Sequence, residues 1–436
     1  MRVRVRHWPN DDSACGWIAA LPPFRPPHVL GGELRTDCVV VGAGFTGLAI
    51  ARQLAVHRPD WRIVVLEAQR AGFGASARNS GFIVDVGHYE PALGIEGNRR
   101  LVRLGRAGRD QLRALVEAHG VECAWSARGR LHGAVSDVGR RALDTFAAGL
   151  EAMGEIYEPL DSRAMARITG TTYYRNGIRT PGTVTVQPAA LARALADMLP
   201  PTIERFEESP VRAIHRETRF RLETGPGTVL TERIFLATDG FTPALGFLRR
   251  HLFPLFTFAS LTRILTPAEQ AALGGDPEWG LVPEERMGST VRRTRDARLL
   301  IRNTVHHAPT FAMRPGVLRR VRAIHRRTFD ARFPMLAGVE LEHTWAGVLG
   351  MSLNGAHFFG QLAPGLFAAA GYNGVGVAMG TIAGRLLADL AVGATSPLLD
   401  DMLELPRPSW IPPQPLLGVG VRTALAVLSA RARAEL

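Results

Sequence analysis

The sequence predicts an α/β fold (α+β overall), in which a Rossmann-like nucleotide-binding domain is assembled from discontinuous segments and carries an inserted antiparallel-sheet domain. Two observations predict this class. Residues 36–67 have the pattern of a strand, a helix and a second strand, and a strand, glycine loop and helix follow again at 358–394. The chain has 436 residues, enough for two or three domains. We therefore expect a second domain between these two patterns.

The first pattern begins with Thr36–Val41, a short apolar run that is typical of a buried parallel strand. It leads directly into the motif Gly42-Ala-Gly-Phe-Thr-Gly47. Apolar residues then recur at helical spacing until Pro59, and residues 62–67 form a second apolar run that ends in Glu67. The order of these segments predicts a complete βαβ unit.

The glycine motif is informative because of this context. Gly42 permits a tight turn, Gly44 lets the backbone approach a pyrophosphate, and Gly47 lets the helix pack closely on the strand. The helix N-terminus adds unpaired N–H groups and a positive dipole. Glu67 lies 20 residues after Gly47, where its carboxylate can accept hydrogen bonds from both ribose hydroxyls and repel a 2′-phosphate. These residues predict a dinucleotide site.

The remaining patterns divide the chain into segments. Helical periodicity appears at 98–120 and 188–199, and short apolar runs between 211 and 237 predict a series of strands. Less regular stretches lie between these segments. We predict that the nucleotide-binding domain consists of residues 30–125, 183–242 and 343–403. The inserted domain consists of residues 126–182 and 243–342, and residues 404–436 form a Pro-rich C-terminal segment with a tail helix.

The composition excludes several enzyme classes. The chain contains no lysine, so its 52 strong cations are all arginine, and the net charge is +12. P-loop nucleotide hydrolases, pyridoxal phosphate enzymes and Ser-x-x-Lys enzymes all need a lysine and are excluded. The arginines are spread along the chain without interleaved aromatics, so we expect no nucleic-acid function. His306 and His307 have no third ligand nearby in the sequence, and we expect no metal site.

Cysteine usage and hydropathy suggest where the protein works. Cys15, Cys38 and Cys123 form no Cys-x-x-Cys pair, which favours a reducing, cytoplasmic setting over a disulfide framework. No apolar stretch follows the charged residues at 1–7, so we expect no signal peptide. Residues 366–384 are uncharged, but they are rich in Gly and Ala, and we expect no transmembrane segment.

Five motifs, in this order, carry a resemblance to a known family. They are Gly-Ala-Ser-Ala-Arg-Asn-Ser-Gly (74–81), Gly-Arg-Leu-His (129–132), Ala-Thr-Asp-Gly-Phe-Thr-Pro (237–243), Trp-Ala-Gly (345–347) and Gly-Tyr-Asn-Gly-Val-Gly (371–376). The chain resembles flavoproteins of the D-amino-acid oxidase and glycine oxidase superfamily over residues 30–400, and most of all the branch that contains gamma-glutamylputrescine oxidase. It departs from the family pattern at Asp239, usually Asn, and at Ala77, usually Gly.

The resemblance implies FAD as the cofactor. Sarcosine-type relatives bind flavin covalently through a C-terminal cysteine, but no cysteine follows Cys123 here, so non-covalent FAD is expected. A second helix N-terminus near Gly376 can point at the flavin N1 and C2 carbonyl, where reduced flavin is negative. The residues expected at the cofactor are Gly42, Gly44, Phe45, Thr46, Gly47, Glu67, Ala68, Gly74, Ala75, Ser76, Arg78, Asn79, Ser80, Gly81, Val211, Ala237, Thr238, Gly240, Gly347, Asn373, Gly374, Val375 and Gly376.

The resemblance also implies oxidation of a primary or secondary amine or an amino acid. A hydride passes from the carbon next to nitrogen to flavin N5, and the resulting imine is hydrolysed to an aldehyde or keto acid. The candidate substrate residues are Tyr372, which would close over the substrate, Arg302, which would hold a carboxylate, and His343 and Trp345, on a strand expected to re-enter the nucleotide-binding domain.

Three functions stay open at this point. The first is an oxidase that releases H2O2. The second is a dehydrogenase that passes electrons to a quinone or a protein acceptor, because relatives use a lysine to promote the reaction with O2 and this chain has none. The third is a basic flavoprotein that docks on RNA or a membrane surface through residues 422–433, although we expect the tail helix to pack on the nucleotide-binding domain.

Overall fold

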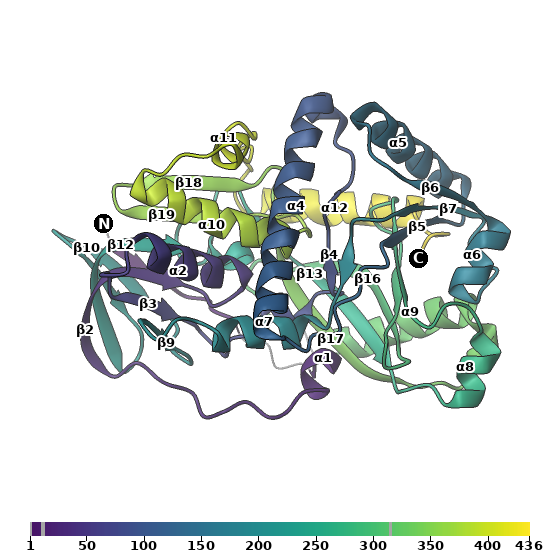
Figure 1. Cartoon of the computed structure of the whole chain (residues 1–436), viewed down its shortest axis with the longest axis horizontal. Helices are drawn as coiled ribbons and strands as arrows, with labels where there is room; N and C mark the ends of the chain where they lie inside the picture. Colours follow the sequence, from purple (N-terminus) through teal and green to yellow (C-terminus); the bar gives the residue numbers. More distant parts are fainter. Residues whose placement is uncertain (1, 10–13, 314–315) are drawn as a thin grey trace.

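Two large mixed sheets organise the chain. The computed structural model describes residues 2–9, 14–313 and 316–436. In Figure 1 the first sheet lies on the left, beside the N-terminus, and the second lies at the centre and right. A small sheet of β4 (Phe82–Ile83) and β8 (Val184–Thr185) accompanies them. The predicted class, an α/β nucleotide-binding domain joined to a second sheet domain, is confirmed.

The first sheet brings the ends of five parallel strands to one edge. Its order is β1-β10-β11-β12-β2-β3-β9, and β19, itself paired with β18, joins the C-terminal half of β12. β12, β2, β3 and β9 are parallel to one another, as are β12 and β19. Their carboxyl ends therefore share an edge, where ligands of open α/β sheets bind. The strands span Arg2–Arg4 (β1), Gly32–Val41 (β2), Ile63–Leu66 (β3), Ile203–Phe206 (β9), Ala213–Arg216 (β10), Phe220–Glu223 (β11), Gly227–Leu236 (β12), Phe358–Ala363 (β18) and Leu366–Ala370 (β19).

Apolar helices cover this sheet. Both α2 (Phe45–His57) and α10 (Ala378–Val392) are apolar on most of their surface, as expected for helices buried on several sides. They pack against each other, and α4 (Gly94–His119) packs against α10. The other helices of this half are α1 (Gly16–Ala19), α3 (Ala75–Arg78), α7 (Pro188–Asp197) and α11 (Pro397–Leu403).

The second sheet has the order β17-β13-β16-β15-β14-β5-β7-β6. Its neighbours are antiparallel except β5 and β14, which are parallel. The helix α9 (Val317–Arg332) packs on β13, β16 and β17. The strands span Arg130–Ala134 (β5), Glu158–Asp161 (β6), Asn176–Thr180 (β7), Phe253–Thr262 (β13), Trp279–Pro283 (β14), Thr290–Arg293 (β15), Leu299–His307 (β16) and Leu341–Met351 (β17), and the remaining helices span Asp137–Met153 (α5), Ser162–Thr169 (α6) and Pro267–Leu273 (α8).

Two domain boundaries that were predicted from the sequence differ from the boundaries of the two sheets. The segment predicted to re-enter the nucleotide-binding domain at 343 is β17, which pairs with β13 along its whole length and belongs to the second sheet. β1, which precedes the predicted start at 30, adds a strand to the first sheet through β10. Both differences arise because strand pairing is long-range, whereas an apolar run in the sequence does not name its partner.

The tail helix packs on the second sheet, and the expectation that it docks on the nucleotide-binding domain is wrong. The helix α12 (Leu416–Arg431) places Leu417, Val421 and Leu425 against Phe253 and Leu255 of β13 and their neighbours. The alternative in which this tail docks on RNA or a membrane stays a prediction. Among the described residues, no single helix is both long and apolar enough to cross a membrane, although α10 and α11, taken together across their 100° bend, would meet the length and composition.

The end of the chain is anchored by Glu435, which is buried. Its carboxylate accepts hydrogen bonds from Ser136 N (2.7 Å), Ser136 Oγ (2.6 Å) and Val135 N (3.1 Å), at the N-terminus of α5. Arg332 donates to the carbonyls of Glu435 and Leu436, both at 2.9 Å. The tail therefore ties α5 to α9.

We expect Glu435→Ala to lower the free energy of unfolding by about 1–3 kcal/mol, because it leaves buried N–H groups without their acceptor. Urea unfolding followed by circular dichroism measures the change. Glu340→Ala is the matched control: this glutamate is 66% exposed and pairs with Arg322, so its loss should cost less than about 1 kcal/mol. Equal losses in the two variants would contradict the anchoring role.

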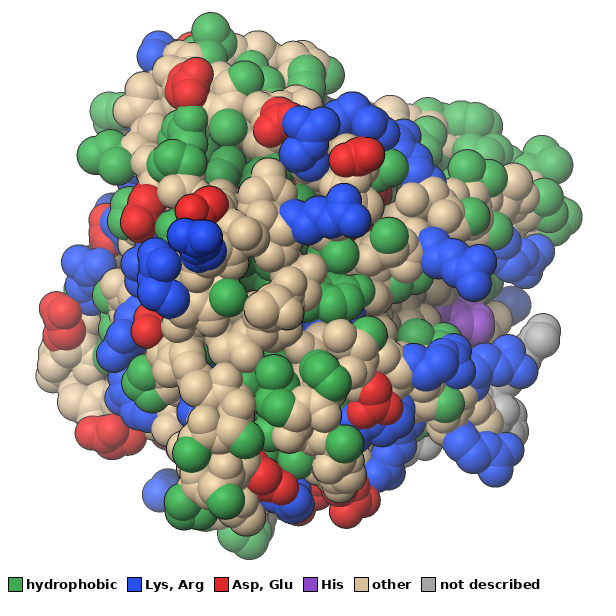
Figure 2. All heavy atoms as spheres, turned by 90° about the vertical axis from the view of Figure 1, so that its right-hand side faces the viewer, with side chains coloured by type: hydrophobic (Ala, Val, Ile, Leu, Met, Phe, Trp, Pro, Cys, Tyr) green, Lys and Arg blue, Asp and Glu red, His purple; other side chains and the backbone are tan. Residues whose placement is uncertain are grey.

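The surface charge is dispersed on the face that Figure 2 shows. Arginine side chains there are interspersed with acidic and hydrophobic ones. Many arginines of the chain pair with carboxylates, as Arg103 does with Asp401 and Arg326 with Asp330. The net charge of +12 is thus spread over local ion pairs and single cations.

Candidate cofactor and active site

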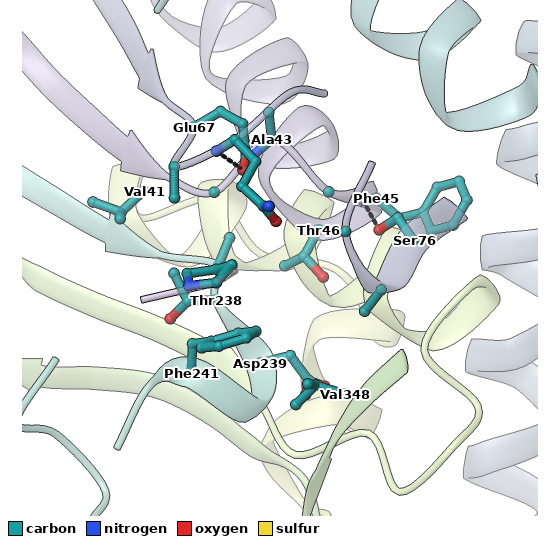
Figure 3. Close-up of a pocket in the computed structure, with 18 of the residues that line it drawn as sticks. Val41, Ala43, Phe45, Thr46, Glu67, Ser76, Thr238, Asp239, Phe241 and Val348 are labelled. Atoms are coloured by element: carbon teal, nitrogen blue, oxygen red, sulfur yellow. Dashed lines mark hydrogen bonds between the residues drawn. The ribbon is translucent and has the colours of Figure 1, made fainter. Parts of the chain in front are cut away.

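A pocket of about 1350 Å³, part of it open to solvent, lies at the carboxyl edge of the first sheet. The residues that follow β2, β3, β12 and β19 line it, together with the start of α2 and the α3 segment. In Figure 3, Glu67 and Ala43 lie on one side of this pocket, and Thr238, Phe241 and Val348 lie across from them. The topology thus brings together segments that are far apart in the sequence.

The three glycines of the first motif each have a steric reason. Gly42 has φ of +103°, and a Cβ there would lie 2.7 Å from the Ala237 carbonyl oxygen. A Cβ on Gly44 would lie 2.7 Å from Ser76 Oγ, and one on Gly47 would lie 1.8 Å from the Gly42 carbonyl oxygen. The turn and the close helix packing therefore agree with the roles inferred from the sequence, and Gly44 leaves the pocket wall as bare backbone.

Glu67 is fixed at the end of β3 by backbone N–H groups. Its Oε2 accepts from Ala43 N at 2.8 Å (Figure 3), and its Oε1 accepts from Gln69 N at 2.9 Å. Burial raises the pKa of this carboxyl, and the two N–H donors act in the opposite direction. Glu67 stands where a dinucleotide site needs a ribose acceptor.

The α3 segment forms another wall of the pocket. Ser76 Oγ accepts a hydrogen bond from Phe45 N at 3.2 Å (Figure 3), and Asn79 Oδ1 accepts one from Gly81 N at 2.8 Å. Arg78, predicted at the cofactor, points away from the pocket because its guanidinium donates to the carbonyls of Phe73 and Ala346, at 2.9 and 3.2 Å. Arg78 thus supports the α3 segment from behind.

Asp239 is a pocket residue that the predicted site did not include. Its carboxylate accepts from Gly350 N and Gly371 N, both at 2.8 Å, and so joins β17 to the loop after β19. From the sequence, Asp239 was identified only as a departure from the family pattern. Its position directly after a parallel strand was the signal that could have placed it at the site.

Tyr372 lies in the wall of the pocket and is almost fully buried. Its hydroxyl is 2.9 Å from Thr46 Oγ1 at the start of α2, and burial raises its pKa. A Cβ on Gly376 or Gly380 would meet its ring at 3.3 to 3.4 Å. This geometry holds the side chain against α2 and α10, so it does not support the predicted closure of Tyr372 over a substrate.

Arg302, His343 and Trp345 share one face of the second sheet. Ala259 of β13 lies opposite both Arg302 and Trp345, and Leu261 lies opposite His343. Trp345 is fully buried, and its indole N–H donates to the Arg78 carbonyl at 3.0 Å, so it supports the α3 segment. His343 packs beside Gly16, and burial lowers its pKa. Neither side chain lines the pocket.

Arg302 differs from these two neighbours. It is half-buried on β16, and burial lowers the pKa of its guanidinium. Within the described parts of the chain, no ion pair or hydrogen bond is formed by this side chain. Most buried arginines of the chain have carbonyl or carboxylate partners, as Arg292 has with Val186 and Arg332 with Glu435.

The pocket unites most of the predicted cofactor residues. Those on its wall are Gly42, Gly44, Phe45, Thr46, Glu67, Ala68, Gly74, Ala75, Ser76, Asn79, Val211, Ala237, Thr238, Gly374 and Gly376. The others, Gly47, Arg78, Ser80, Gly81, Gly240, Gly347, Asn373 and Val375, lie outside the wall. Some of these support it from behind: Asn373 Oδ1, for example, accepts from Ser352 N at 2.9 Å and fixes the loop after β19.

The pocket wall also contains residues that were not predicted at the cofactor, namely Val5, His7, Trp8, Pro9, Phe241, Leu245, Val348 and Leu349. The first four come from the N-terminal segment, and the last two from β17. Among residues 2–9, 14–313 and 316–436, no group of three or more His, Cys, Asp or Glu side chains has the arrangement of a metal site.

The residues of the pocket fit FAD. The pocket follows a glycine turn, and Cβ atoms at these glycines would fill the space beside the turn. The pocket begins at a helix N-terminus and contains Glu67 as an acceptor for a ribose. Cys15, Cys38 and Cys123 are buried, and none lines the pocket, in keeping with a non-covalent cofactor.

Comparison with known proteins gives the same cofactor. The family model for FAD dependent oxidoreductases (DAO) matches residues 37–390. The chain is 28% identical over 411 residues to a probable oxidoreductase OrdL of Rhizobium meliloti (strain 1021), covering 90% of this chain and 92% of the relative. It is 27% identical over 394 residues to gamma-glutamylputrescine oxidoreductase of Escherichia coli (strain K12), covering 86% and 88%. The structure of glycine oxidase from Geobacillus kaustophilus shares the fold, with a TM-score of 0.70, 22% identity and coverage of 84% and 96%. The chain therefore belongs to the DAO family of FAD-dependent oxidoreductases.

Proposed function

We propose that this FAD-dependent oxidoreductase oxidises the C–N bond of an amine that carries a carboxylate, and that it passes the electrons to O2. The substrate class is a primary or secondary amine or an amino acid. In the overall reaction, the amine, O2 and water give an aldehyde or keto acid, the free amine or ammonia, and H2O2. The observation that carries the proposal is the unpartnered guanidinium of Arg302 on the second sheet.

The position of Arg302 suits a substrate carboxylate. Two parts of the same sheet face are covered by other segments. Trp345 and Gly347 lie under the α3 segment, and Leu255 and Val305 lie under α12. Arg302 therefore lies beside these two covered areas. Leu349, which is on the pocket wall, shares this face but pairs with Leu255, four residues along β13 from Ala259, the partner of Arg302. A half-buried cation has lost part of its hydration, and a carboxylate with two oxygens matches its fork of donors.

The names of two similar proteins agree with this class. Glycine is an amino acid, and gamma-glutamylputrescine is an amine that carries a carboxylate. Both compounds contain an amine and an anionic carboxylate. A single guanidinium beside the cofactor could orient either of them.

The chain's own groups position and desolvate the reactants. FAD, when bound, supplies the hydride acceptor that protein side chains lack. Glu67 would hold the adenosine ribose, the N-terminus of α2 would face the pyrophosphate, and Ser76 fixes the α3 segment on Phe45 N. Arg302 would bind the carboxylate and so direct the carbon next to nitrogen at the flavin. The amine has to be neutral for hydride loss, and a closed, apolar surrounding favours its neutral form.

A second candidate keeps the same amine chemistry but uses another electron acceptor. The absence of lysine favours it, because relatives that the chain resembles use a lysine near the flavin to promote the reaction with O2. In that case a quinone or a protein would reoxidise the flavin. We propose the cytoplasm as the compartment, because the three cysteines are widely spaced in the sequence and form no Cys-x-x-Cys pair.

Anaerobic mixing of the holoenzyme with a panel of polyamines, N-methyl amino acids, other amino acids and aminophosphonates tests the proposal. A substrate bleaches the flavin absorbance near ~450 nm, and admission of O2 then reports on the acceptor. We expect bleaching by amines with a carboxylate and rapid recovery with H2O2 in O2. Slow recovery in O2 but fast recovery with a quinone would favour the dehydrogenase, and no bleaching by any amine would contradict both.

A further inference from the structure

The N-terminal arm, defined here as residues 2–9, is built onto the edge of the nucleotide-binding sheet. β1 pairs with β10 in antiparallel register, and Val5 N continues the pairing to the Arg212 carbonyl at 2.8 Å. Val3 and Val5 face the core beneath the sheet, while the alternating arginines of this segment face outward. This charged segment is therefore a strand with one apolar face.

The arm continues from this strand along the cofactor pocket. Val5, His7, Trp8 and Pro9 all lie on the pocket wall. On the same wall are Pro210 and Val211, next to Arg212, and the run from Glu67 to Arg70. Because Glu67 marks the ribose of the adenosine half, the arm borders the adenosine end of FAD.

Trp8 is the aromatic residue of the arm. It is 40% exposed, although it is large and apolar, and the Arg212 guanidinium lies 5.5 Å from the centre of its ring. An exposed indole on the wall of a nucleotide pocket offers a flat apolar surface to a purine.

A second attachment of the N-terminal part of the chain lies on the far side of the pocket. Trp17, in α1, donates its indole N–H to the Asn79 carbonyl at 2.9 Å and packs edge-on against Trp345 at 6.2 Å. Asn79 itself lines the pocket. The N-terminal part of the chain is thus attached at the sheet edge before Trp8 and at the α3 segment after it.

We propose that the N-terminal arm is the cover of the adenosine end of the FAD site, and that Trp8 stacks on the adenine ring. This inference rests on FAD as the cofactor and does not depend on the substrate. The arm has to move aside before FAD can leave, so it slows release of a cofactor that is held without a covalent bond.

Loss of FAD from the holoenzyme tests this directly. Free flavin fluoresces more strongly than most bound flavin, so dilution and ultrafiltration give both the release rate and the Kd. We expect Trp8→Ala to weaken FAD binding about 5- to 150-fold, the range for loss of one base–aromatic stack, and Trp8→Phe to retain most of the affinity. Trp410→Ala is the matched control, because Trp410 is 60% exposed, also lies near an arginine (Arg250, 5.3 Å), and is not on the pocket wall.

FMN separates stacking from a general loss of structure, because it has the isoalloxazine ring but no adenosine. Apoprotein of the full chain should bind FMN with the same Kd whether residue 8 is Trp or Ala, while ADP should bind the Trp8→Ala variant more weakly. If the Trp8→Ala variant released FAD at the wild-type rate, the proposal would be overturned. Equal losses of affinity for FAD and for FMN would also overturn it. None of these readouts needs turnover, so failure to find an amine substrate leaves them interpretable.

Discussion

Gly47→Ala is expected to destroy FAD binding, although it adds a single methyl group. The added Cβ would lie 1.8 Å from the Gly42 carbonyl oxygen, 3.0 Å from its carbonyl carbon and 3.3 Å from Val40 Cγ1. Two of these atoms belong to the backbone of the glycine turn, so no side-chain rotation can make room. α2 would have to move away from β2, and the helix N-terminus would leave the position that it needs at the pyrophosphate.

The expected cost in the free energy of unfolding is about 3 kcal/mol or more, at the upper end for overpacking in a core. The measurements are the flavin absorbance of the purified protein and its urea unfolding curve. Gly420→Ala is the control: Gly420 lies in α12, a Cβ there meets nothing within 4 Å, and the change should stabilise that helix by about 0.5–1 kcal/mol. A yellow Gly47→Ala protein with a wild-type unfolding midpoint would show that the turn tolerates a side chain.

The parts of the fold that the sequence predicts well are those fixed by local patterns. The first glycine turn and Glu67 follow β2 and β3 as predicted, and the strand expected before the second glycine loop, within 358–394, is found as β19. An apolar run followed by small residues specifies a buried strand and its turn within a few residues. The helix expected near Gly376 begins at Ala378. The local patterns and the family resemblance together placed 15 of the 33 residues on the pocket wall, since the carboxyl ends of parallel strands meet at one edge.

The parts that were missed depend on long-range contacts. Trp345 was predicted near the substrate because it stands in a recognisable motif, but its N–H bonds to Arg78 on a segment more than 260 residues earlier. The tail helix is apolar on several sides, so its pattern could not indicate which sheet it covers. The alternation of Arg and Val in the N-terminal arm is a strand pattern, but no local signal says that the strand joins β10 and leads to the cofactor.

Arg302→Leu is expected to lower kcat/KM for a carboxylated amine by about 30- to 1,000-fold, because removal of one partner of a buried charge pair costs about 2–4 kcal/mol. The fall should depend on the substrate. An amine of the same size without the carboxylate makes no use of the guanidinium, so its kcat/KM should change little. FAD content should remain at the wild-type level, since Arg302 lies on the second sheet and not on the cofactor wall.

Arg302→Lys sharpens this test. It keeps a positive charge but loses the flat fork that binds two oxygens at once, so an intermediate kcat/KM is expected for the carboxylated amine. Arg322→Leu serves as the control, because Arg322 is 44% exposed, pairs with Glu340 and lies on α9. If Arg302→Leu lowered kcat/KM equally for both amines, Arg302 would support the sheet and not bind the substrate. The ratio of the two kcat/KM values, and not either value alone, therefore decides whether the unpartnered guanidinium selects the carboxylate.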